Sequence, residues 1–99
     1  MAAIKYYAGE QGSHSTLNIT APTVIYARMG KVFNVSILVS PTAAGGVYDA
    51  ATTAGAVQAN QCNVIPAAAT GIIACNGEWV FNGLLIVPGT GGAVSVWWL

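Results

Sequence analysis

Apolar and polar residues alternate along the segment "KVFNVSILVS", which has the clearest periodic pattern in the chain. One face of this segment carries Phe33, Val35, Ile37 and Val39. Asn34 and Ser36 point to the other face, so the alternation predicts a half-buried β-strand. The β-branched and aromatic residues of Thr23–Tyr26 predict a second strand just before it. The two strands flank "RMGK", which we interpret as the turn of a β-hairpin.

Short apolar runs bounded by turn residues continue through the rest of the chain. "GGVYDA" (45–50) predicts one strand, and "QCNVIP" (61–66) predicts another that stops at its proline. "GIIACNGEWVFNGLLIVPG" divides into three pieces at Asn76-Gly77 and Asn82-Gly83, because both residues of an Asn-Gly pair tolerate the positive φ angles of hairpin turns. "GLLIVP" and "AVSVWWL", on either side of "GTGG", predict a closing β-hairpin.

The fold class follows from the number and spacing of these strands. No segment carries apolar residues at the spacing of an amphipathic helix. The alanine-rich stretches "DAATTAGAVQAN" and "IPAAATG" are predicted as loops with at most a turn of helix. About seven to eight short strands are typical of one small antiparallel β-sandwich, jelly-roll-like or immunoglobulin-like. We place this all-β domain at residues 21–99, after an extended N-terminal arm or edge hairpin at residues 1–20.

The last strand places two adjacent tryptophans on opposite faces. Val94, Val96 and Trp98 share one face, while Ala93, Ser95 and Trp97 share the other. Because successive side chains alternate across a strand, Trp98 joins the core if the valine face is buried, and Trp97 then points outward. Trp97 needs a cover, either the N-terminal arm of its own chain or a neighbouring subunit. The candidate protein-interface residues are Tyr6, Tyr7, Trp97 and Leu99.

Charged side chains are scarce and balanced. Hydrophobic residues make up 55% of the chain and charged residues 6%, with a formal net charge of zero. Such a surface favours self-association, so we expect a homo-oligomer. With equal numbers of positive and negative side chains, the chain lacks the excess positive charge typical of nucleic-acid-binding proteins. No apolar run approaches the roughly 20 residues that cross a bilayer. The N-terminus lacks the apolar core of a secretory signal, so we expect synthesis in a cytoplasm and no membrane partner.

The residues that carry chemistry form no catalytic pattern. The three carboxylates, Glu10, Asp49 and Glu78, are far apart in the sequence. His14 lies between serines in "GSHST" without the elbow motif of a serine hydrolase. "PGTGG" lacks the lysine and the following helix of a phosphate-binding loop. We therefore predict no enzyme, and we expect Asp49 to cap a turn at the end of its strand.

The two cysteines offer no metal site. Cys62 and Cys75 belong to no Cys-x-x-Cys pair, and the chain has one histidine, so a zinc ligand set is missing. A disulfide between them would close a short loop, but a cytoplasmic product more often keeps such residues as small buried thiols. We therefore expect two free thiols, and no catalytic, cofactor-binding or metal-binding residue.

The chain resembles a small β-module encoded by tailed bacteriophages and prophages. The resemblance rests on four stretches in a fixed order: "PTVIYARMGKVFNVSILVS", "AAGGVYDAATTAGA", "NQCNVIPAAATG" and "FNGLLIVPGTGGAVSVWW". Such modules share a Tyr-Asp element, an Ile-Pro or its equivalent, and a closing Gly-Leu hairpin. The resemblance covers residues 21–99. The chain departs from it by ending on Trp97-Trp98-Leu99 in place of a single aromatic residue.

The resemblance implies a non-enzymatic role in the virion. The leading hypothesis is a capsid decoration (cement) protein, a homotrimer that binds the major capsid protein on the outer head surface and stabilises the shell. The first alternative is a head-fibre, neck or tail component, including a host-attachment module whose carbohydrate site would use Trp79 or Trp97 beside Asn76 or Asn82. The second is a host-derived binding module unrelated to virions.

Overall fold

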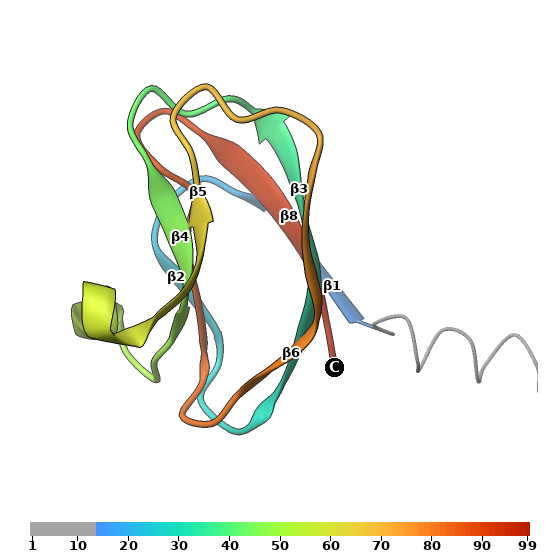
Figure 1. Ribbon diagram of the computed structural model, residues 1–99, viewed down its shortest axis with the longest axis vertical. Helices are drawn as coiled ribbons and strands as arrows, with labels where there is room; N and C mark the ends of the chain where they lie inside the picture. The colour runs from blue at the N-terminus through green and yellow to red at the C-terminus, as the bar shows by residue number, and fades with distance from the viewer. Residues whose placement is uncertain (1–13) are drawn as a thin grey trace, which may run out of the picture.

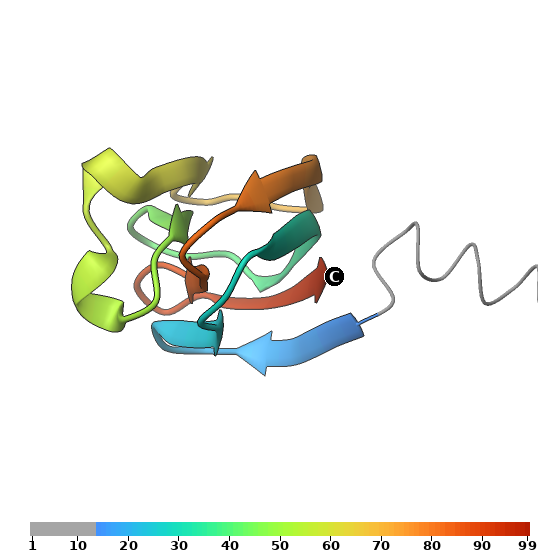
Figure 2. The same ribbon diagram turned by 90° about the horizontal axis from the view of Figure 1, so that it is seen from below.

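The computed structural model describes residues 14–99, which form two antiparallel sheets of four strands each (Figure 1). The first sheet has the order β1 (His14–Ile19), β8 (Ala93–Trp98), β3 (Gly30–Val39) and β6 (Ile72–Val80). The second sheet has the order β2 (Thr23–Tyr26), β7 (Leu84–Val87), β4 (Gly45–Asp49) and β5 (Gln61–Ile65). Two single turns of 3₁₀ helix, η1 (Thr53–Gly55) and η2 (Gln58–Asn60), lie between β4 and β5 and project from one side of the sandwich (Figure 2).

This strand order is that of a jelly roll. Among the described strands, each one is followed by a strand of the opposite sheet, except that β4 is followed by β5 in the same sheet. An immunoglobulin-type sandwich instead pairs its first two strands within one sheet. The prediction of an all-β antiparallel sandwich is therefore confirmed, in its jelly-roll form.

The core lies between the two sheets and is built from aliphatic side chains of both. The side chains with no exposed surface include Val32, Val35, Val47, Ile65, Val80, Leu84, Ile86, Val94 and Val96. Burial of apolar surface is the main favourable term in folding, so this layer holds the sheets together. In β8 the valines point inward and Trp98 packs against the same core, as the alternation of the last strand predicts.

The predicted hairpins are wrong. The strands on either side of "RMGK", β2 and β3, lie in opposite sheets, as do β7 and β8 on either side of "GTGG". Asn82-Gly83 separates two strands as predicted, but these strands, β6 and β7, also lie in opposite sheets. A short connection rich in glycine can return along one sheet or cross between two packed sheets. Local turn residues do not distinguish these two paths.

The other Asn-Gly pair, Asn76-Gly77, lies inside β6. Both residues have positive φ angles, 57° and 73°, but the strand continues through them. The pairing with β3 shifts register at this point, and the dipeptide bulges opposite Phe33. Val32 and Val35 are consequently the buried residues, whereas Phe33 is half-buried outside the core. The predicted inward face is therefore wrong for Phe33, and also for Val39, which is exposed.

The remaining segments agree more closely with the predictions made from the sequence. The alanine-rich connection after β4 contains the two single turns η1 and η2, and no helix of residues 14–99 is long and apolar enough to span a membrane. β1 forms an edge of the first sheet and belongs to the segment predicted as an N-terminal arm or edge hairpin. The rest of that segment, including Tyr6 and Tyr7, lies outside the described residues.

Asp49, the last residue of β4, holds the connection between β6 and β7 in place. Its carboxylate accepts hydrogen bonds from the backbone N–H groups of Phe81 at 3.0 Å and Asn82 at 2.7 Å. A longer contact of 3.4 Å reaches the N–H group of Gly83, whose carbonyl accepts a bond from Ala50 at 3.1 Å. The expectation that Asp49 caps a turn is confirmed, and the carboxylate is occupied by the backbone.

Replacing Asp49 with alanine should lower the free energy of unfolding by about 2 kcal/mol, because the backbone donors lose a charged acceptor. Asp49→Asn should cost about half as much, since its amide oxygen retains a neutral acceptor. Urea denaturation followed by circular dichroism measures both values. An Asp49→Ala protein as stable as the wild type would show that water replaces the carboxylate at no cost.

Candidate binding surfaces

Trp98 is fully engaged by its own chain. Its indole Nε1 donates a hydrogen bond to Thr16 Oγ1 at 3.1 Å, and its ring stacks on that of His14 with centroids 4.6 Å apart. The Tyr26 ring lies 5.0 Å away, and the Arg28 guanidinium lies over both Tyr26 and Trp98. The indole thus joins β1 to β2 at one end of the sandwich, and its contacts with His14, Tyr26 and Thr16 indicate a structural role.

The ionisable groups near the core have structural surroundings. Burial raises the pKa of Tyr26 to about 12, only partly opposed by Arg28, and its hydroxyl donates to the Lys31 carbonyl at 3.2 Å. Cys62 and Cys75 are free thiols, as expected, and burial raises the pKa of both, that of Cys75 to about 11. Neutral thiols are poor nucleophiles. Among residues 14–99 no cluster of three potential metal ligands is found.

Trp97 lies on the outer face of the first sheet, beside a small pocket. Trp97, Asn34, Ser36 and Ile72 line this pocket, which has a volume of about 160 Å³. Asn34 of β3 is directly opposite Trp97 of β8, and Ser36 is directly opposite Ile72 of β6. Paired residues of adjacent strands share a face, so these four side chains stand together on rigid strands. We refer to them as the Trp97 pocket.

A second exposed area lies at the end of the same sheet, where the C-terminus ends. Leu99 and Trp79 flank Lys31: backbone hydrogen bonds join Leu99 to Lys31 on one side, and Trp79 pairs with Lys31 on the other. The Lys31 ammonium lies over the Trp79 ring, 4.7 Å from its centroid. Gly30 and Val80 form the terminal β3–β6 pair, and Met29 directly precedes Gly30 while Phe81 directly follows Val80.

The exposed fractions in this area are unusually high for large apolar residues: 54% for Met29, 50% for Trp79, 65% for Phe81 and 38% for Leu99. We call these four residues the apolar end. Large apolar groups gathered in one place on a surface mark sites of interaction with other macromolecules.

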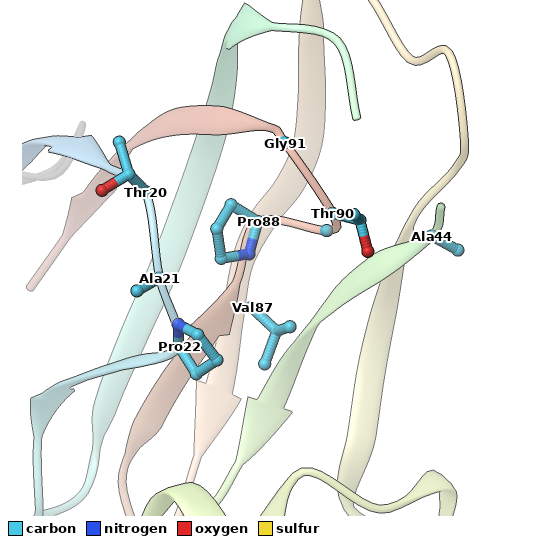
Figure 3. Close-up of a pocket in the computed structure, with 9 residues that line it drawn as sticks. Thr20, Ala21, Pro22, Ala44, Val87, Pro88, Thr90 and Gly91 are labelled. Atoms are coloured by element: carbon cyan, nitrogen blue, oxygen red, sulfur yellow. The ribbon is translucent and has the colours of Figure 1, made fainter. Parts of the chain in front are cut away.

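The opposite end of the sandwich carries a larger but less distinctive pocket of about 320 Å³ (Figure 3). Its walls come from the β1–β2, β3–β4 and β7–β8 connections, and Figure 3 shows Pro22, Val87 and Pro88 among them. The remaining lining residues are Thr20, Ala21, Ala44, Gly89, Thr90 and Gly91. None of the nine is charged or aromatic, so this pocket offers little to fix the orientation of a ligand.

Of the predicted interface residues, Trp97 and Leu99 are placed on the outer face of the first sheet, while Tyr6 and Tyr7 lie outside the described residues. Sequence reasoning missed that Asn34 and Ser36 would meet Trp97, although it placed both on an outward face. It also missed Met29 and Phe81. Both sit in connections between strands, where no periodic pattern reports exposure.

Comparison with protein-family models, with curated proteins and with solved structures finds no match for this chain. The resemblance to phage β-modules stays a prediction.

Proposed function

We propose that the protein is a structural component of a tailed-phage virion, a capsid decoration protein that binds the outer surface of the head. The apolar end is the observation that carries this proposal, because it exposes four large apolar side chains close together, with Lys31 lying over Trp79 and Arg28 bonded to the Met29 carbonyl. Jelly-roll sandwiches are also common in viral capsid and lectin domains. The fold alone decides nothing, since one fold hosts many functions.

The proposed mechanism is association without catalysis. Contact between the apolar end and the major capsid protein would remove apolar surface from water, which stabilises a complex by about 25 cal/mol for each Å² buried. A homotrimer presents three such ends at once, so a modest single contact becomes a strong combined one. Bridging adjacent capsid subunits in this way would stabilise the shell. The role requires no catalytic, cofactor-binding or metal-binding residue.

Phe81→Ser should weaken binding to heads that lack the protein by roughly tenfold or more, because an exposed aromatic anchor is lost. The fold should be unaffected, since the side chain is 65% exposed and Asp49 holds only the backbone of this residue. Co-sedimentation of purified protein with heads measures the affinity. Val57→Ser, at another exposed apolar residue, is the matched control and should bind like the wild type.

The same preparations test the oligomer. The wild-type protein should sediment as a trimer or larger in analytical ultracentrifugation. A monomer that binds heads equally well with or without the Phe81 side chain would contradict both the oligomer and the assigned surface.

A head-fibre, neck or tail component is the alternative function, favoured by one observation, the aromatic and polar Trp97 pocket on the outer face. A host-attachment module of this kind needs a carbohydrate site. Asn76 and Asn82, the polar partners suggested by the sequence, do not line the pocket. The position of the protein on the virion separates the two functions.

A further inference from the structure

We propose that the Trp97 pocket binds a neutral saccharide, with one sugar ring lying on the indole and its hydroxyl groups bonded to Asn34 and Ser36. This inference goes beyond the decoration role and does not depend on it. The pocket shares none of its four lining residues with the apolar end, although Trp97 and Leu99 lie only two residues apart on the same outer face.

The geometry of the pocket suits a ring-shaped ligand of modest size. Trp97, Asn34 and Ile72 come from three adjacent strands, β8, β3 and β6, so paired backbones fix their spacing. A volume of about 160 Å³ is small beside the roughly 300–1,000 Å³ of typical drug-sized sites and matches a single sugar ring. Sites built on strands hold their side chains more precisely than sites on loops.

The polar groups of the pocket are available to a ligand. Within residues 14–99 the side chains of Asn34 and Ser36 make no hydrogen bond to the protein. An amide and a hydroxyl each offer donors and acceptors, as do the adjacent hydroxyls of a sugar. The aromatic ring supplies a broad apolar surface for the C–H face of the sugar. The pocket therefore combines the two kinds of contact that a saccharide needs.

The charges around the pocket indicate a neutral ligand. No ionisable side chain lines it, and Lys31, the cation on the same sheet, lies over Trp79 instead. A phosphate, sulfate or carboxylate group would find no counter-charge here. An apolar protein segment fits poorly too, because covering Asn34 and Ser36 without hydrogen bonds would cost about 1–3 kcal/mol for each group.

Two experiments test the proposal on the full chain. A glycan array probed with labelled protein should show binding to neutral saccharides. Titration with glucose, galactose, mannose and N-acetylglucosamine, followed by ¹H–¹⁵N NMR, should then shift one of the three indole N–H signals. That signal should be the one missing from the spectrum of Trp97→Ala. The chemical shifts of the other two indoles should stay in place.

Variants separate the pocket from the rest of the face. Trp97→Ala should reduce affinity for the best saccharide roughly tenfold or more, and Ser36→Ala should reduce it by a smaller factor. Trp97→Phe should retain much of the binding, because it keeps an aromatic face. Leu17→Ala, at a 64% exposed residue of the same sheet outside the pocket, is the matched control and should bind like the wild type.

The proposal is overturned if no neutral saccharide binds, or if Trp97→Ala binds as well as the wild type. It is also overturned if Leu17→Ala loses affinity to the same extent, or if Trp97→Ala dissociates the oligomer, since the face would then be a subunit interface. Co-sedimentation of Trp97→Ala with phage heads should be unchanged. Loss of saccharide binding therefore remains distinguishable from failure of the decoration role.

Discussion

Replacing Trp98 with alanine should lower the free energy of unfolding by about 3 kcal/mol, whereas the same change at its neighbour Trp97 should lower it by about 1 kcal/mol or less. Trp98 stacks on His14, contacts Tyr26 and donates a hydrogen bond to Thr16, so its removal opens the junction between β1 and β2. Buried Trp→Ala changes cost roughly 3–5 kcal/mol, and partial exposure places Trp98 at the lower end.

The contrast between the two tryptophans is the informative part. Trp97 borders an open pocket and does not pack against the core, so its loss leaves the sheets joined. Urea denaturation of both variants, with the midpoint and slope fitted together, measures the difference. Equal losses for the two variants would mean that the outer indole is as structurally important as the inner one, contrary to the assignment of faces.

Gly45→Ala should lower the free energy of unfolding by about 3 kcal/mol or more, because β4 and β7 approach too closely at this point for any side chain. A Cβ atom on Gly45 would lie 2.0 Å from the Val87 carbonyl oxygen and 2.5 Å from the Gly89 nitrogen. Both atoms belong to the backbone, so relief requires the strands to separate. Overpacking of a well-packed interior commonly costs 1–3 kcal/mol, and a clash with the backbone exceeds that range.

Gly71→Ala is the matched control for this prediction. Gly71 has a φ of +77°, and a Cβ atom there would meet nothing within 4 Å. Its substitution should cost only the roughly 1–2 kcal/mol of a left-handed alanine. Thermal and urea unfolding measure the loss of stability in each variant. The difference between them compares the cost of steric overlap at Gly45 with the cost of backbone strain at Gly71. A Gly45→Ala protein that is more stable than Gly71→Ala would contradict the close approach of β4 to β7.

The sequence predicts the fold class of this chain well and its connections poorly. Alternation along β8 separates Trp97 from Trp98, and strand length and turn spacing indicate a sandwich. The path of each connection depends on whether the next strand packs in the same sheet or the opposite one. That choice is decided by the whole core and not by the residues of "RMGK" or "GTGG". An Asn-Gly pair, which is typical of hairpin turns, even occurs inside β6, where Asn76-Gly77 forms a bulge.

The Trp97 pocket is a site that the sequence likewise predicts only in part. Alternation places Asn34 and Ser36 on an outward face, and this holds in the structure. Asn34 and Ser36 lie beside Trp97 only because of the register between β3 and β8. This register shifts between Val32 and Asn34. At this point Phe33 is an extra residue of β3 with no partner in β8, and no apolar or polar pattern in the sequence predicts it. Pairing across strands is a tertiary property.

Cryo-electron microscopy of the virion, supported by immunogold labelling with an antibody against this protein, tests the proposed decoration role most directly. We expect density and label over the whole outer surface of the head, in many symmetric copies that contact the major capsid protein through the apolar end. Label confined to a single vertex, or to the fibres, neck or tail, would contradict the decoration role.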